Sequence, residues 1–168
     1  DPEKIKNADK VVLPGVGAAA TAMNHLESRG LVNCIRELTQ PVLGICLGMQ
    51  LLFSSSSEGD TDCLDIIPGR LERLPDGPGI RVPHMGWNAV TQTKDDELLK
   101  EMPELPWFYF VHSYFAPMGE FTLASSQHGA AFSAIVRMNN FYGAQFHPER
   151  SATDGARLLQ NFLELPCS

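Results

Sequence analysis

The chain has 168 residues, which suits one domain of ordinary size, and 43% of them are hydrophobic, enough to bury a core. Its 20 acidic and 13 basic residues give a net charge of −7, which argues against nucleic acid or an anionic membrane surface as the main partner. No apolar run approaches the roughly 20 residues that a membrane-spanning helix needs, and the N-terminal sequence has no signal-peptide pattern.

The first half of the chain alternates strand and helix patterns, which is typical of a parallel α/β sheet. Apolar runs predict the strands, amphipathic runs predict the helices, and glycine or proline separates them. The predicted elements are, in chain order, a strand at residues 7–13, a turn at 14–17, helices at 18–29 and 31–38, a strand at 41–45, and a helix from 47 to about 56.

After the serine run at residues 54–57, short strand patterns alternate with glycine and proline turns, and Asn139 and Asn140 resemble a hairpin connection. The predicted strands are residues 66–74, 80–83, 87–92, 107–115, 121–127, 132–137 and 141–147, and a helix at 151–164 closes the chain. We see no internal repeat and no linker. We therefore expect a single domain over residues 1–168, a three-layer α/β fold with an open, mostly parallel, flavodoxin-like sheet flanked by helices.

The four cysteines form no CxxC pair and have no metal-like spacing with histidine. We therefore expect no metal site, no cofactor and no disulfide framework, and we place the chain in a reduced, cytoplasmic compartment. Three of the cysteines, Cys34, Cys63 and Cys167, lie in settings where simple packing or surface exposure explains them.

Cys46 has a different setting, because it lies between Gly44 and Gly48 at the junction of a predicted strand and a predicted helix. This Gly-x-Cys-x-Gly arrangement is the thiol form of a nucleophile elbow, in which glycines avoid collisions with the strand and the helix. The following helix directs N–H groups at the sulfur, which would favour a thiolate, and the N–H of Leu47 could stabilise an oxyanion. A small buried core residue is the plain alternative.

A thiol nucleophile needs a proton carrier, and His147 is the best placed of the five histidines because it ends an apolar strand. Glu149 lies two residues later, on the same side of an extended chain, and could orient the imidazole. Alone, the His-Pro-Glu sequence would be read as a strand-ending turn. Together with the cysteine elbow it predicts a Cys46–His147–Glu149 triad.

These residues lie in three stretches that resemble the class I, triad-type glutamine amidotransferases: LPGVG at residues 13–17, GICLGMQLL at 44–52 and GAQFHPERS at 143–151. Four further stretches resemble one branch of that family, the glutaminase subunits of imidazole glycerol phosphate synthases. They are SSSSEG at 54–59, IPGRLERL at 67–74, VPHMGWNAV at 82–90 and FYFVHSY at 108–114. The resemblance covers nearly the whole chain.

The resemblance implies hydrolysis of glutamine to glutamate and ammonia through a thioester on Cys46. The ammonia would pass to a separate cyclase subunit with a (β/α)₈ barrel, as a heterodimer, for histidine biosynthesis. There it would help to form imidazole glycerol phosphate and an aminoimidazole carboxamide ribotide. The resemblance also implies that the free subunit is weakly active and that the cyclase with its ligand completes the site.

Further residue roles are implied by position within the family motifs. The oxyanion donors would be the backbone N–H groups of Leu47 and of Val16 or Gly17. The glutamine pocket would use Gln50 and Glu58, and the backbone of His112, Ser113 and Tyr114. The cyclase would contact His84, Met85, Gly86, Trp87 and Arg150. Each has a plainer reading: a polar helix residue for Gln50, a solvated loop for Glu58, a buried strand for residues 108–114, and a core tryptophan for Trp87.

The start of the chain departs from the family pattern, in which a strand, a helix and a second strand precede the segment matched by residues 7–17. We therefore expect an N-terminally incomplete domain that lacks its first strand–helix–strand, with an exposed sheet edge. Three other functions remain open. They are a glutaminase serving anthranilate, aminodeoxychorismate, guanylate or carbamoyl phosphate synthesis, a noncatalytic regulatory module, and a cysteine hydrolase or γ-glutamyl peptidase that needs no acceptor protein.

Overall fold

The computed structural model describes residues 1–167. The helices are α1 (Pro2–Lys6), α2 (Ala19–Ser28), α3 (Leu31–Arg36), α4 (Leu47–Gln50) and α5 (Ala152–Glu164), with short 3₁₀ turns η1 (Glu58–Asp60), η2 (Glu97–Leu99) and η3 (Pro148–Arg150). The strands are β1 (Val11–Leu13), β2 (Val42–Ile45), β3 (Phe53–Ser56), β4 (Thr61–Asp62), β5 (Ile67–Arg73), β6 (His84–Ala89), β7 (Thr91–Gln92), β8 (Trp107–His112), β9 (Tyr114–Phe115), β10 (Thr122–His128), β11 (Ala130–Met138) and β12 (Phe141–Ala144).

The main sheet has six strands in the order β1-β2-β12-β11-β10-β7. Strand β2 pairs in parallel with β1 and with β12, whereas the pairs from β12 to β7 are antiparallel. The expected α/β architecture is confirmed, but the sheet is mixed rather than mostly parallel. The reason is that β10, β11 and β12 follow one another through short turns, and a short turn can join only antiparallel neighbours.

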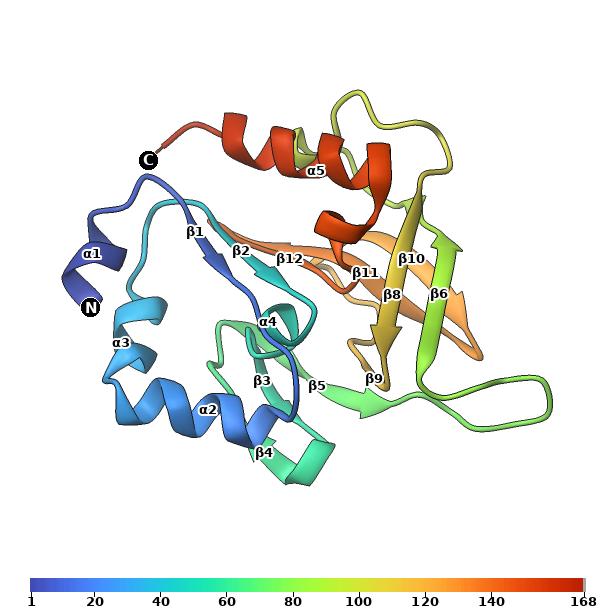
Figure 1. Cartoon of the computed structure of the whole chain (residues 1–168), viewed down its shortest axis with the longest axis horizontal. Helices are drawn as coiled ribbons and strands as arrows, with labels where there is room; N and C mark the ends of the chain where they lie inside the picture. Colours follow the sequence, from blue (N-terminus) through green and yellow to red (C-terminus); the bar gives the residue numbers. More distant parts are fainter. Residues whose placement is uncertain (168) are drawn as a thin grey trace.

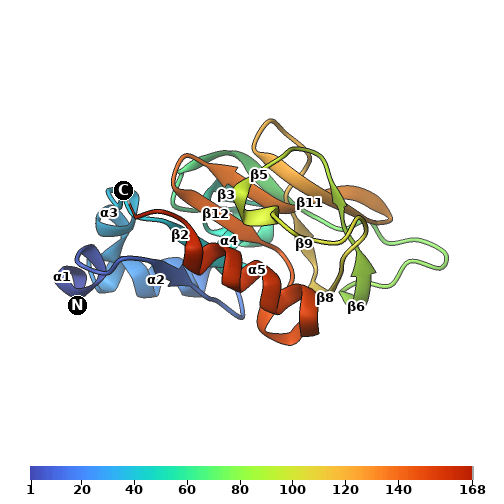
Figure 2. The same cartoon turned by 90° about the horizontal axis from the view of Figure 1, so that it is seen from above.

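Helices cover both faces of the main sheet, with α5 on one face and α2, α3 and α4 on the other (Figure 1). Alternate residues of β2 serve the two faces, because Leu43 and Ile45 pack with Leu158 and Phe162 of α5, and Val42 packs with Met23 and Ile35 of α2 and α3. The pair β6–β8 lies at the end of the molecule opposite α1 and α3 (Figures 1 and 2).

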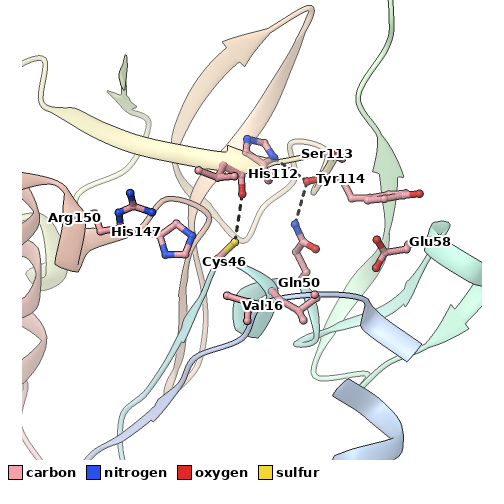
Figure 3. A pocket seen from close by; sticks show the side chains of 12 residues that line it. Val16, Cys46, Gln50, Glu58, His112, Ser113, Tyr114, His147 and Arg150 are labelled. Carbon is pink, nitrogen blue, oxygen red and sulfur yellow. Dashed lines mark hydrogen bonds between the residues drawn. The ribbon is translucent and has the colours of Figure 1, made fainter. Parts of the chain in front are cut away.

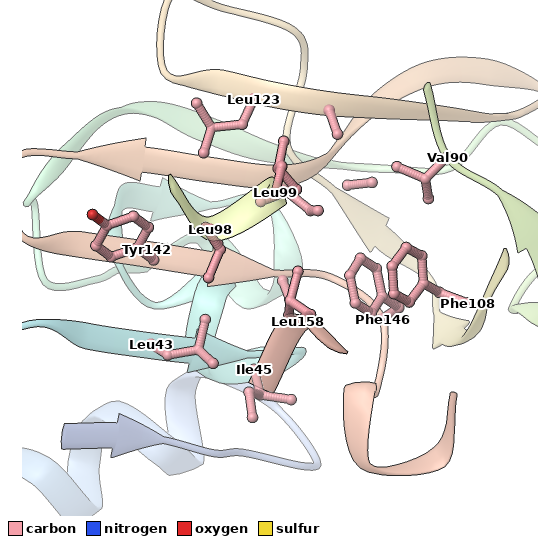
Figure 4. Packing of buried hydrophobic residues seen from close by; sticks show 14 of the residues in the cluster. Leu43, Ile45, Val90, Leu98, Leu99, Phe108, Leu123, Tyr142, Phe146 and Leu158 are labelled. Atoms are coloured by element: carbon pink, nitrogen blue, oxygen red, sulfur yellow. The ribbon is translucent and has the colours of Figure 1, made fainter. Parts of the chain in front are cut away.

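The core on the α5 side is dominated by aromatic rings and leucines (Figure 4). The rings of Phe108 and Phe146 stack with centroids 3.8 Å apart, and both side chains are fully buried. Because Phe146 precedes His147, this packing anchors the end of the chain segment that carries the candidate base.

Two predicted elements are wrong. The helix expected from 47 to about 56 ends at Gln50, and Phe53–Ser56 forms strand β3, which pairs in parallel with β5. Serine is a poor helix former, and the pairing buries Phe53 completely. The strand expected at 80–83 is instead a turn region with one isolated bridge between Gly77 and Ile80.

The remaining predicted strands and the C-terminal helix are confirmed within a few residues, and Asn139 occupies a left-handed turn position between β11 and β12. Strand β6 begins three residues earlier than expected. Strand β1 lies at the edge of the main sheet. None of the helices in residues 1–167 combines the length and apolarity that crossing a membrane requires.

Candidate active site

Cys46 lies between β2 and α4 with a backbone conformation that side chains other than glycine rarely adopt, φ 54° and ψ −113°. The two flanking glycines make this turn possible. A Cβ atom on Gly48 would lie 1.7 Å from the carbonyl oxygen of Leu13, and one on Gly44 would lie 2.7 Å from the backbone of Gly48. The turn therefore has the strained strand-to-helix geometry that the Gly-x-Cys-x-Gly spacing predicted.

The thiol of Cys46 is buried and has polar neighbours on two sides. Its Sγ donates to the carbonyl oxygen of Val111 at 3.7 Å, and the amide of Gln145 donates to Sγ at 3.9 Å. Burial raises the pKa of the Cys46 thiol to about 11, the N–H of Leu47 lowers it, and the charge of Glu149 raises it.

The expected thiolate is therefore not the resting form, since burial outweighs the helix. Helix α4 has only four residues, so its N-terminal dipole is small. Within residues 1–167, no hydrogen bond joins Sγ to the ring of His147. The structure holds a neutral thiol whose proton is donated to the strand β8 backbone.

His147 follows β12, and its ring faces the sulfur of Cys46 in the same pocket (Figure 3). Its Nδ1 lies 2.7 Å from Glu149 Oε1. Because a carboxylate only accepts, Nδ1 carries a proton and Nε2 is the nitrogen left to exchange one. The backbone is held as well: the N–H of His147 donates to Tyr109, and the Ser151 hydroxyl donates to the carbonyl of His147.

A pocket of about 330 Å³ opens beside Cys46 and His147. Most of the residues predicted for the oxyanion site, the glutamine pocket and the proton carrier line it together. They are Val16, Gly17, Cys46, Leu47, Gln50, Glu58, His112, Ser113, Tyr114, His147 and Arg150, and the remaining lining residue is Val111. Segments from four separated parts of the chain thus converge on one cavity, with Glu149 behind the ring of His147.

Two polar side chains on the far wall of the pocket are fixed by hydrogen bonds. Gln50 is 7% exposed, and its Nε2 donates to the carbonyl of Tyr114 and to Gln145 Oε1, each at 3.0 Å. Glu58 Oε1 accepts the N–H of Ala19 at 2.7 Å, at the first residue of α2. This bond ties Glu58 to the segment that follows the Val16–Gly17 turn.

The residues expected to face a partner are only partly exposed. Met85 and Trp87 are 62% and 50% exposed, and Gly86 between them has φ 131°. His84, however, is 4% exposed, so the expectation that its side chain faces a partner is wrong. Side chains alternate along β6, which turns His84 inward toward His112.

Arg150 belongs to both the pocket and this exposed surface. Its guanidinium lies 4.7 Å from the centre of the Tyr109 ring, and that ring lies 6.2 Å from the ring of Trp87. The three side chains form a row from the pocket to the surface that carries Met85 and Trp87.

Sequence reasoning missed three residues that the structure brings to the site: Val111, Gln145 and Tyr109. Val111 acts through a backbone carbonyl, which no side-chain pattern reveals. Gln145 had a signal, because it lies two residues before His147 and points to the same side of an extended chain. In residues 1–167, no group of three or more His, Cys, Asp or Glu side chains has the arrangement of a metal site.

Comparisons with known proteins agree with this geometry. The family model described as glutamine amidotransferase class-I matches residues 1–165. The chain is 54% identical over 165 residues to the imidazole glycerol phosphate synthase subunit HisH of Idiomarina loihiensis, covering 98% of this chain and 83% of that protein. It is 51% identical to the protein of the same name from Xanthomonas axonopodis pv. citri, covering 98% and 82%.

Solved structures share the fold at lower identity. A crystal structure of a glutamine amidotransferase aligns with a TM-score of 0.72 at 20% identity, covering 98% of this chain and 82% of that one. A GMP synthase subunit from Thermoplasma acidophilum aligns with a TM-score of 0.70 at 20% identity, covering 97% and 75%. At this identity the likeness concerns the fold only.

Proposed function

The chain belongs to the class I glutamine amidotransferase family, and from this membership we propose that it is the glutaminase subunit of an imidazole glycerol phosphate synthase. It hydrolyses glutamine to glutamate and ammonia for histidine biosynthesis. The observation that carries the proposal is that a strained, buried cysteine and a carboxylate-bonded histidine share one pocket in a chain 54% identical to such a subunit.

In the proposed reaction, Sγ of Cys46 attacks the side-chain carbonyl carbon of glutamine as its proton passes to Nε2 of His147. The tetrahedral oxyanion accepts hydrogen bonds from Leu47 N–H and from the Val16–Gly17 turn. Collapse breaks the C–N bond, and His147 returns the proton to the leaving ammonia. Water then attacks the thioester, giving its proton to His147, and glutamate leaves as the thiol is restored. The sum is glutamine plus water giving glutamate plus ammonia.

Glu149 supports this cycle by accepting from Nδ1, which keeps Nε2 directed at the reacting atoms and stabilises the imidazolium. The resting thiol is poorly activated, since burial raises its pKa to about 11 and its proton is donated to Val111. Low activity of the chain alone follows from these two features. Activation then requires Sγ to exchange Val111 for His147.

The proposed partner is the cyclase, whose (β/α)₈ barrel would form a heterodimer with this chain and receive the ammonia. Support comes from the exposed Met85 and Trp87, and from Arg150, whose guanidinium lies over Tyr109 between the pocket and that surface. We also propose the cytoplasm as the compartment, because all four cysteines are free thiols.

Glutamate release from glutamine tests the proposal, measured for the chain alone and with the cyclase together with its nucleotide ligand. We expect stimulation by the cyclase, and a loss of at least about a thousandfold in Cys46→Ala and His147→Ala. Cys167→Ala is the matched control, since Cys167 is exposed and far along the chain from the pocket, and it should keep wild-type activity.

Two outcomes would overturn the proposal. Equal activity with and without the cyclase would indicate a hydrolase that needs no acceptor. Stimulation by a different synthase, and not by the cyclase, would place the chain in another branch of the family.

A further inference from the structure

Two buried histidines next to the pocket have no part in the proposed reaction. His84 of β6 and His112 of β8 are 4% and 5% exposed, and His84 Nδ1 lies 3.0 Å from His112 Nε2. The ring of His84 is stacked between Phe110 and His128, with centroids 4.9 and 4.2 Å away. This stacking fixes the plane of the ring and therefore the direction of both of its nitrogens.

One end of the pair is set by Asn88. Its Oδ1 accepts the N–H of Ala89 at 2.8 Å and its Nδ2 donates to the carbonyl of Gln127 at 3.0 Å, so the amide has only one consistent orientation. The same Nδ2 lies 3.4 Å from Nε2 of His84. His84 Nε2 therefore faces a donor and must accept, which leaves the proton of a neutral His84 on Nδ1.

The other end is set by a carbonyl. His112 Nδ1 lies 2.8 Å from the carbonyl oxygen of Tyr114, which can only accept, so Nδ1 of His112 carries a proton. In a neutral ring Nε2 of His112 is then an acceptor, and it receives the Nδ1 proton of His84. Both ends thus require the same arrangement, with the proton on Nδ1 of each histidine.

The carbonyl of Tyr114 joins this pair to the pocket. It also accepts from Nε2 of Gln50, whose second Nε2 proton goes to Gln145. With both amide protons used, the pocket-facing atom left on Gln50 is Oε1, to which no group in residues 1–167 donates. The orientation of the Gln50 amide, and so the presence of an acceptor in the pocket, depends on where the Tyr114 carbonyl points (Figure 3).

We propose that His84 and His112 are positioning residues for glutamine binding. As a pair of neutral, Nδ1-protonated rings they hold the Tyr114 carbonyl, which orients Gln50 so that it offers an acceptor to the substrate. This role rests on the proposed glutaminase function, but it concerns residues that touch neither the reacting atoms nor, through their side chains, the substrate.

The electrostatics of the two rings are consistent with permanent neutrality. Burial lowers the pKa of His84 to about 4, with a further lowering by His128. Burial lowers the pKa of His112 to about 3, against the raising effect of the Tyr114 carbonyl. An added proton would also set two donors face to face at Asn88, so neither ring is suited to act as an acid or base near pH 7.

The first test reads the tautomers in the unmodified chain by ¹⁵N NMR of its imidazole nitrogens. Free neutral histidine favours the Nε2–H form, whereas we expect His84 and His112 both to be Nδ1–H and to stay neutral from pH 5 to 8. The signals are assigned by their loss in His84→Asn and His112→Asn. Either ring in the Nε2–H form, or charged in this range, would overturn the proposal.

The second test uses pairs of substitutions that keep one ring nitrogen each, because an asparagine amide occupies the place of Nδ1 and a glutamine amide the place of Nε2. His112→Asn retains the donor to Tyr114 and should keep KM for glutamine within about twofold. His112→Gln loses that donor and should raise KM about fivefold, with kcat changed by less than about twofold. At His84 we expect the same order, with asparagine better than glutamine.

A purely structural role would make the two substitutions at each position equivalent, or would lower kcat and thermal stability without the KM difference, and either result would overturn the proposal. Thermal unfolding is recorded for every variant. If the wild type releases no glutamate while both rings are Nδ1–H, the glutaminase function fails and the arrangement stands. If the wild type is active and asparagine and glutamine are equivalent, the positioning role fails and the glutaminase function stands.

Discussion

Replacing Gly48 by alanine should separate the nucleophile turn from the candidate oxyanion turn. The new Cβ would lie 1.7 Å from the carbonyl oxygen of Leu13 and 2.7 Å from its carbonyl carbon. Leu13 ends β1 and is followed directly by residues 14–17, which include Val16 and Gly17. The collision is with backbone, so no side-chain rotation can relieve it.

The size of the effect follows from this distance. Even the closest contacts that Cβ atoms tolerate are near 3.0 Å, so β1 and α4 must part by at least about 1.3 Å. Overpacking of this kind costs about 1–3 kcal/mol of folding stability. A displacement near 1 Å between catalytic groups costs about a hundredfold in rate. We therefore expect a folded but less stable protein with glutaminase activity lowered about a hundredfold or more.

Urea unfolding and cyclase-stimulated glutamate release measure the two effects. Gly77→Ala is the control, because a Cβ there would lie 3.6 Å from Ile80, an ordinary contact, and Gly77 does not have a positive φ. It should match the wild type in both assays. Wild-type stability and activity in Gly48→Ala would refute the claim that close approach of β1 and α4 builds the site.

Three further predictions concern the triad and its surroundings. Alkylation by iodoacetamide at pH 8 should label exposed Cys167 well before Cys46, whose reactivity should rise only toward pH 11; because the folded pKa of Cys46 is raised, its thiol adds stability that is complete below about pH 9 and is lost as pH rises through about 11, and equal labelling at pH 8 would contradict this. Glu149→Gln should lower kcat at least about a hundredfold with little change in KM, measured in the cyclase complex, since the amide no longer favours imidazolium on His147; a KM effect alone would argue for a binding role. Gln145→Leu should cost about 1–3 kcal/mol in urea unfolding because it leaves a buried donor of the pocket amide without its acceptor, and an unchanged midpoint would show that this hydrogen bond adds nothing to stability.

The sequence predicted the parts of the site that depend on residue type and spacing. The glycines around Cys46 have a steric purpose that can be stated before any coordinates, and the close backbone approaches at Gly44 and Gly48 agree with it. The two-residue spacing of His147 and Glu149 likewise predicts that they face the same side, and they are hydrogen-bonded.

What the sequence could not predict depends on the environment that the fold creates. The helix pattern after Cys46 suggested a lowered thiol pKa, but the helix is four residues long and burial has the larger effect. Residues 53–56 continue an apolar run, and only pairing with β5 makes them a strand. His84 lies in a stretch expected at a partner surface, and the first residue of a strand can point either way until its register with β8 is known.

The register of β6 with β8 brings together the features that the sequence left apart. His84 pairs with His112, Met85 with Val111, and Trp87 with Tyr109. One strand of the ladder thus carries the exposed apolar side chains, and the other carries the carbonyl that holds the Cys46 proton. Because paired strands move together through their shared hydrogen bonds, any shift of β6 that follows contact at Met85 or Trp87 also moves the Val111 carbonyl. The resting state of the thiol and the exposed surface are therefore parts of one mechanical unit, built from two short strands.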